Sequence, residues 1–236
     1  MIVAKYWLRT VLIFGFIVLF TSPAFSQIDK SSYYFSGVNK NPLDTFIFNQ
    51  PNYPAFKTVL QTGSISSRFD CFGTIGEGLG LPLGPIDYFT SFPDPSFETP
   101  PLSRHEYLFL SAIWVGGIVN QDTLVSVGFD GWRSDNEFKP TYFPDSGTIV
   151  ENNSSSDFSV TATYTDTITA GVPNDYFGRL HMPLNVKITA TPHIVYSAPL
   201  NNVIFYDITV ENIGEDDINQ GFIGIYTDAD IGSRIG

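Results

Sequence analysis

The chain has 236 residues, of which 12 are Lys or Arg and 24 are Asp or Glu, so its formal net charge is −12 at pH 7. A surface this acidic repels nucleic acid and anionic lipid, which excludes both as partners. Because Cys71 is the single cysteine, a hydrophobic core and not an intrachain disulfide must stabilise the fold. We expect Cys71 to be buried, as free cysteines usually are.

Residues 1–26 have the layout of a secretory signal peptide. Two basic residues come first, then the ten apolar residues Val11–Phe20, then small residues before a cleavage point between Ser26 and Gln27. The apolar run is too short for a stable transmembrane helix, which needs roughly 20 residues. Cleavage would leave 10 basic against 24 acidic residues, a net charge of −14. We therefore expect a protein that is secreted or lies at the outer cell surface, with no membrane insertion after cleavage.

Residues 27–103 are predicted to be an irregular N-terminal region of strands and loops. The stretch SISSRFDCF, residues 64–72, has the alternation of a strand. Residues 91–103 contain four prolines, which exclude a central strand or a helix interior. We expect this segment to be an exposed loop.

The region from Tyr107 to Phe129 is predicted to be a β-hairpin. Its arms are Tyr107–Val119 and Thr123–Phe129, and residues 120–122, Asn-Gln-Asp, suit a short connection. Gly116 and Gly117 interrupt the first arm, which indicates a β-bulge or a close backbone approach.

Three further segments alternate apolar and polar residues, as half-buried strands do. Their predicted inward faces are Phe158, Val160, Ala162 and Tyr164; Leu184, Val186, Ile188 and Ala190; and Ile204, Tyr206, Ile208 and Val210. On the last segment we expect Asp207, Thr209 and Glu211 to face water.

Residues 212–221 are rich in turn formers and lead to a final predicted strand, Phe222–Tyr226. Antiparallel strands with one wet face predict an all-β protein, one large or two small β-sandwiches with long Gly/Pro-rich loops. We place the sandwich region at residues 104–236.

No catalytic motif is present, so no catalytic residue and no cofactor is assigned. Gly78, Gly80 and Gly84 have the wrong spacing for a dinucleotide-binding loop. The His105-Glu106 pair opens like a zinc-protease motif, but Phe109 stands where the second histidine is required. A Gly-x-Ser-x-Gly nucleophile elbow is also missing.

The stretch TDADIG raises the question of a metal site. Asp228 and Asp230 alternate on an extended segment, so both side chains point the same way and could share one hard cation, with calcium as the candidate. The segment does not continue as an EF-hand loop, because position 5 is Gly232. The alternative is the polar end of a strand.

Surface aromatics are a second lead. Residues 31–37 (SSYYFSG), Trp132 and residues 141–144 (TYFP) are candidate platforms for sugar rings, or else packing residues. Polysaccharide is therefore a candidate partner.

Two blocks of this chain resemble a family of large, secreted, β-rich bacterial proteins. The first block is WVGG…DTLVS…DGW, here residues 114–117, 122–126 and 130–132; the second is N-x-G…GIY-x-D-x-D, here residues 212–214 and 224–230. The resemblance implies an extracellular protein that is usually longer and often ends in a sorting tail. On that basis the chain is expected to be an N-terminal fragment or a truncated gene product.

The sequence thus favours a secreted or cell-surface structural and binding module without its own catalytic activity. Two alternatives stay open: the non-catalytic N-terminal part of a secreted peptidase or glycosidase, and a carbohydrate-binding module.

Overall fold

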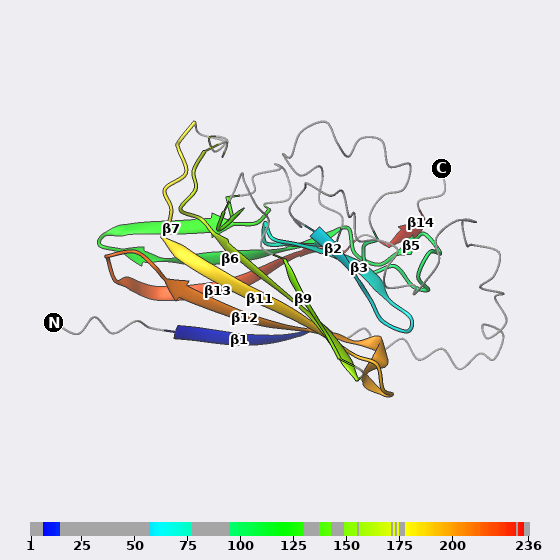
Figure 1. Ribbon diagram of the computed structural model, residues 1–236. Helices are drawn as coiled ribbons and strands as arrows, with labels where there is room; N and C mark the ends of the chain where they lie inside the picture. The colour runs from blue at the N-terminus through cyan, green and yellow to red at the C-terminus, as the bar shows by residue number, and fades with distance from the viewer. Residues whose placement is uncertain are drawn as a thin grey trace.

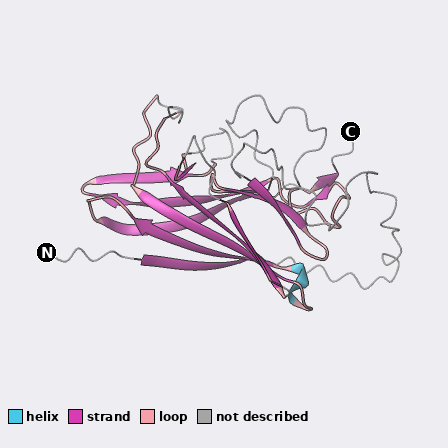
Figure 2. Ribbon diagram, viewed as in Figure 1, coloured by secondary structure: helices cyan, strands magenta, loops and turns pink. Residues whose placement is uncertain are grey.

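The computed structural model describes residues 7–14, 57–76, 95–129, 137–142, 149–154, 156–170, 172, 174, 178–229 and 231–233, and residues 7–14 by their backbone only. These residues form antiparallel β-sheets, and their one helical element is the short 3-10 turn η3 (Leu200–Asn202). Figure 2 shows this turn in cyan among the strands. The all-β prediction is confirmed.

Sheet A is built from the second half of the chain and one N-terminal strand. Its order is β1 (Trp7–Phe14), β12 (Ile204–Asn212), β11 (Val186–Val195) and β10 (Asp157–Thr165), with β8 (Lys139–Pro140) and β9 (Val150–Asn153) both paired to the far edge of β10.

Sheet B has the order β13 (Ile218–Asp228), β6 (Leu110–Val119), β4 (Thr74–Gly76), β3 (Ser66–Asp70) and β2 (Lys57–Gln61), with β7 (Asp122–Val127) also paired to β6. A third, two-stranded sheet joins β5 (His105–Glu106) to β14 (Gly232–Ser233). Figure 1 shows the strands β11 and β12 of sheet A running obliquely to the strands β6, β7 and β13 of sheet B. Because β2, β3 and β4 come from residues before 104, the predicted N-terminal region supplies part of the same sheet as the hairpin.

One hydrophobic core lies between sheets A and B. The predicted inward faces of β10, β11 and β12 all belong to it, and Tyr164, Ile188 and Tyr206 are fully buried. Sheet B contributes Phe69, Phe72, Ile113 and Val115, among others. Cys71 is also fully buried in this core, as predicted.

The outward face of β12 is less exposed to solvent than the sequence predicted. Glu211 was expected to face water but is only 6 % exposed, because it lies beside Lys187 on β11, whose Nζ is 2.5 Å from the Glu211 carboxylate. A lysine stem on the neighbouring strand can cover a carboxylate and neutralise it at the same time.

The predicted hairpin is confirmed, with Asn120 and Gln121 as its turn and Asn120 at a φ of 56°. The two glycines lie where the partner strand β13 is irregular, because its register with β6 shifts between Asn219 and Phe222. A Cβ on Gly117 would lie 2.5 Å from Cγ2 of Ile218. The predicted close approach is therefore real, and the bulge belongs to β13.

The proline-rich segment is not simply an exposed loop, which corrects that prediction. Within its described part, Ser96, Phe97 and Glu98 are buried. The backbone N–H of Ser66 donates to the carbonyl of Glu98, and that of Arg68 donates to Pro95, so the segment runs along β3. Its prolines stop it from becoming a full strand but do not prevent these contacts.

Candidate functional site

The two recognised sequence blocks meet on the outer side of sheet B. Trp114 on β6 and Tyr226 on β13 have ring centroids 5.9 Å apart and planes only 9° from parallel. The Nε1–H of Trp114 donates to the carbonyl of Phe129 at 2.7 Å, which fixes the ring orientation. The pair packs on Leu110 and Ala112, which face away from the main core.

The same face continues beside the ring pair as an uncharged apolar surface. Directly opposite residues of antiparallel strands point to one face; the register places Gly116 between Val125 and Phe222, and Trp114 opposite Gly224. Phe222 is 67 % and Val125 47 % exposed. We call Trp114, Gly116, Val125, Phe222, Gly224 and Tyr226 the aromatic face.

Of the two predicted metal-binding residues, Asp228 lies at the end of the strand that carries this face. Asp228 is the last residue of β13, its side chain is half-buried, and its carbonyl accepts a hydrogen bond from the N–H of Phe109 at 2.9 Å. Asp230 lies outside the described residues. Among the residues that the structure describes, no group of three His, Cys, Asp or Glu side chains is placed to hold a metal ion. The cation site therefore stays a prediction.

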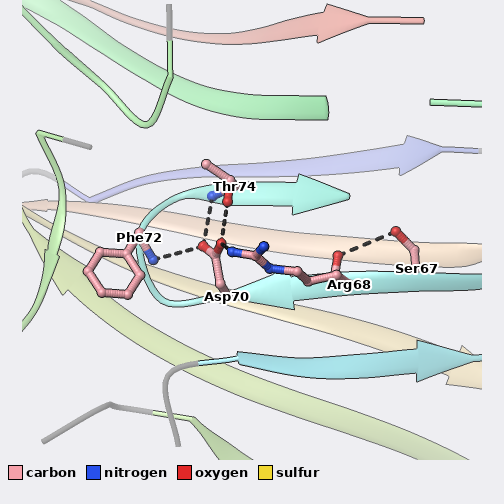
Figure 3. Close-up of polar contacts among 5 residues, drawn as sticks. All are labelled: Ser67, Arg68, Asp70, Phe72 and Thr74. Carbon is pink, nitrogen blue, oxygen red and sulfur yellow. Dashed lines mark hydrogen bonds and ion pairs between the residues drawn. The ribbon is translucent and has the colours of Figure 1, made fainter. Parts of the chain in front are cut away.

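A buried ion pair, which sequence reasoning missed, organises the β3–β4 turn (Figure 3). Asp70 is fully buried, and its carboxylate lies 2.8 Å from a guanidinium nitrogen of Arg68. It also accepts hydrogen bonds from the backbone N–H of Phe72 at 2.9 Å, the N–H of Thr74 at 3.1 Å, and the Thr74 hydroxyl. Each interaction holds the turn, so Asp70 acts as a structural residue.

A second buried carboxylate ties the two sheets together. Asp166, at the end of β10, accepts hydrogen bonds from the Ser126 hydroxyl on β7 at 2.6 Å and from the N–H groups of Leu184 and Val186 at 2.7 and 2.9 Å. Burial raises the pKa of Asp166 above its usual value, although these hydrogen bonds lower it. A fully buried Ser126 is closed to a substrate, so this pair is not a nucleophile and its base.

His181 lies in the same region but takes part in a different contact. Its Nδ1 is 3.3 Å from the Glu137 carboxylate, which also accepts a hydrogen bond from the N–H of Val127. Burial lowers the pKa of His181, but the hydrogen bond and charge of Glu137, together with the charge and backbone hydrogen bond of Asp166, outweigh burial and raise it. The segment that carries Glu137 is thereby fastened to the end of β7.

Glu106 has a raised pKa, which the sequence did not predict. Burial and the nearby charge of Glu98 raise its pKa to about 7. Glu98 itself accepts hydrogen bonds from the Ser66 hydroxyl at 3.4 Å and from the N–H of Arg104. Both causes favour the neutral form of the Glu106 carboxyl group at the start of β5.

The remaining sequence candidates are only partly described. Tyr142 is 67 % exposed, as a sugar platform requires, whereas Trp132, residues 31–37 and the glycines of residues 78–84 lie outside the described residues. His105 is exposed at the β5–β14 pairing, and His193 lies on β11.

Comparison with known proteins found no matching protein-family model, curated protein or solved structure. Within the described ranges, no helix has the length and hydropathy that crossing a membrane takes.

Proposed function

We propose that this protein is an exported binding module of the extracellular space or outer cell surface, without catalytic activity of its own. The aromatic face is the observation that carries this proposal. Its side chains are uncharged in a chain that would carry a net charge of −14 after export, and Phe222 is 67 % exposed. Exposed apolar groups that form one patch on a soluble protein commonly mark an interaction site.

Two buried acids, Asp70 and Asp166, support a binding role over a catalytic one. Asp70 accepts its hydrogen bonds from Phe72, Thr74 and Arg68, and Asp166 from Ser126 and two backbone N–H groups. Each carboxylate is thus engaged in holding a turn or a pair of strands. General acids and bases need instead to reach a substrate.

A neutral polysaccharide is the ligand class that the aromatic face fits best. The aromatic face exposes Phe222 and Val125 beside the stacked rings of Trp114 and Tyr226. Gly116 and Gly224 add no side chains that would obstruct a chain lying across it. Thr123 and Asn219, opposite Ile118 in the next row of the sheet, supply polar side chains without charge. Amphipathic rings with polar neighbours suit ligands that are both apolar and hydroxylated.

Co-sedimentation with insoluble polysaccharides tests this proposal. The exported protein is mixed with neutral glucans, xylan and chitin, and the fraction left in solution is measured. We expect one polymer to deplete the wild-type protein, and we expect Phe222→Ser to weaken binding. Leu180→Ser, at a position that is 76 % exposed in the loop before β11, is the matched control and should bind like the wild type. Equal binding by both variants would refute the aromatic face as the site.

We also propose that Asp228 and Asp230 bind calcium weakly. Asp228 ends β13, and Asp230 follows two positions later in the sequence. Carboxylate pairs favour a hard cation, and millimolar extracellular calcium would fill even a weak site. Because ligand binding to the native state raises its stability, calcium should raise the melting temperature of the wild type but not of Asp228→Asn with Asp230→Asn. An identical rise in both proteins would exclude this site.

A further inference from the structure

The N-terminal strand β1 occupies the edge of sheet A. Eight residues pair with β12 in antiparallel register, from Trp7 opposite Glu211 to Phe14 opposite Ile204. Figure 1 shows this strand in blue beside β12. The other edge of β12 pairs with β11 over its whole length.

All eight residues lie within the predicted signal peptide, residues 1–26, and Val11–Phe14 belong to its apolar segment. Export with cleavage after Ser26 would remove β1 and leave one edge of β12 without its partner. An unpaired edge of this length presents a row of backbone N–H and C=O groups to any incoming strand.

Several other sheet edges in the described part of the chain carry features that discourage strand addition, and β12 does not. In sheet B, β13 has a register shift between Asn219 and Phe222, and β2 is only five residues long. In sheet A, β8 and β9 cover the far edge of β10. In contrast, β12 has nine residues, an unbroken register with β11, and no proline. Natural edge strands are usually protected by bulges, prolines or shortness.

We propose that the exposed β12 edge of the exported protein binds an extended, apolar strand of another protein, with a basic residue opposite Thr209. The register between β1 and β12 indicates which side chain the edge favours. Arg9 of β1 lies opposite Thr209. Asp207 and Glu211, two residues to either side of Thr209, lie on the same face. A long basic side chain at that position can reach both diagonal positions. This inference rests on the export proposed above.

A second copy of the chain is a poor occupant for this edge. The strand β12 contains two acidic residues and no Lys or Arg, and each exported copy would carry a net charge of −14. Pairing two such strands brings like charges together, which destabilises the pair.

A peptide-binding experiment on the exported protein tests the inference. The probe is a fluorescent peptide with the sequence of residues 5–15 and an uncharged Gly-Ser tail, and binding is followed by fluorescence anisotropy. We expect saturable 1:1 binding. Placing Glu at the Arg9 position of the peptide should weaken binding roughly fivefold, since the cross-strand contact with the Asp207 carboxylate becomes repulsive. Placing Pro at both the Val11 and Leu12 positions should abolish binding. Of two consecutive residues in a strand, one directs its N–H to the partner strand, and proline removes that donor.

A charge swap controls for non-specific apolar adhesion. The Asp207→Lys variant of the protein should bind the wild-type peptide more weakly. It should also restore binding of the peptide that carries Glu at position 9. Equal binding of the proline-containing peptide, absence of saturable binding, or a dimer of the exported protein in sedimentation would each overturn the inference. The intact mass of the exported protein distinguishes a failure of the proposed cleavage from a failure of the proposed strand binding. A cleaved protein that binds no peptide refutes this inference alone, whereas retention of residues 7–14 refutes the cleavage on which it rests.

Discussion

The close contact between Gly117 and the β13 bulge makes a sharp prediction about stability. An alanine Cβ at position 117 would lie 2.5 Å from Cγ2 of Ile218 and 3.4 Å from the carbonyl oxygen of Asn219. Carbon atoms pack best about 3.5–4.0 Å apart, so the two strands must separate by about 1 Å. Ile218 is β-branched and packs on the core, which leaves it little freedom to move.

The neighbouring Gly116 provides the matched control. Its alanine Cβ would make only ordinary contacts, at 3.5 Å from the carbonyl oxygen of Leu124 and from Cγ2 of Val125. Replacing a strand glycine by alanine gains roughly 0.5–1 kcal/mol where space allows, whereas overpacking costs about 1–3 kcal/mol. We therefore expect Gly116→Ala to be neutral or slightly stabilising and Gly117→Ala to be destabilised by about 1–2 kcal/mol.

Urea denaturation followed by tryptophan fluorescence measures both variants, because Trp114 lies on the same strand. The midpoint should fall for Gly117→Ala with an unchanged slope, since the surface exposed on unfolding is the same. In thermal melting the loss corresponds to about 2–4 °C per kcal/mol in a domain of this size. Equal midpoints for the two variants would refute the reasoning that Gly117 exists to accommodate the bulge.

Three further predictions concern the buried acids. Asp70→Ala should lower the free energy of unfolding by about 3–5 kcal/mol, because it leaves the Arg68 charge buried without its carboxylate partner; a loss below 1 kcal/mol in urea denaturation would contradict this. Asp166→Ala should destabilise by more than about 2 kcal/mol, since two backbone N–H groups lose their acceptor; Asp122→Ala, exposed at the start of β7, should cost less than about 0.5 kcal/mol. For Glu106 the pKa is raised to about 7 from 4.5, so its neutral form is favoured in the folded state. Its stabilising contribution is full below pH 4.5 and lost as the pH rises through about 7. Glu106→Gln, which stays neutral, should therefore match the wild type in melting temperature at pH 4.5 and exceed it at pH 8; parallel curves would show that Glu106 has no such role.

Local patterns were sufficient to predict β10, β11 and β12 and their inward faces. Every second residue of these strands is apolar over most of their length, and that period indicates a strand with one buried face. The Gly116-Gly117 pair likewise predicted a close approach, because glycine is favoured where a partner backbone leaves no room for Cβ.

Contacts between distant segments could not be predicted in the same way. Asp166 meets Ser126 across 40 residues, and Trp114 meets Tyr226 across two sequence blocks. No local period encodes which strands become neighbours, so these partners follow only from the topology. The burial of Glu211 was missed for the same reason, because its cover comes from Lys187 on another strand.

The intact mass of the exported protein tests the account most directly. The account predicts that the chain found outside the cytoplasm begins at Gln27, so that residues 1–26 are gone and the edge of β12 is open. A mass that includes Trp7–Phe14 would contradict both the cleaved signal peptide and the strand-accepting edge.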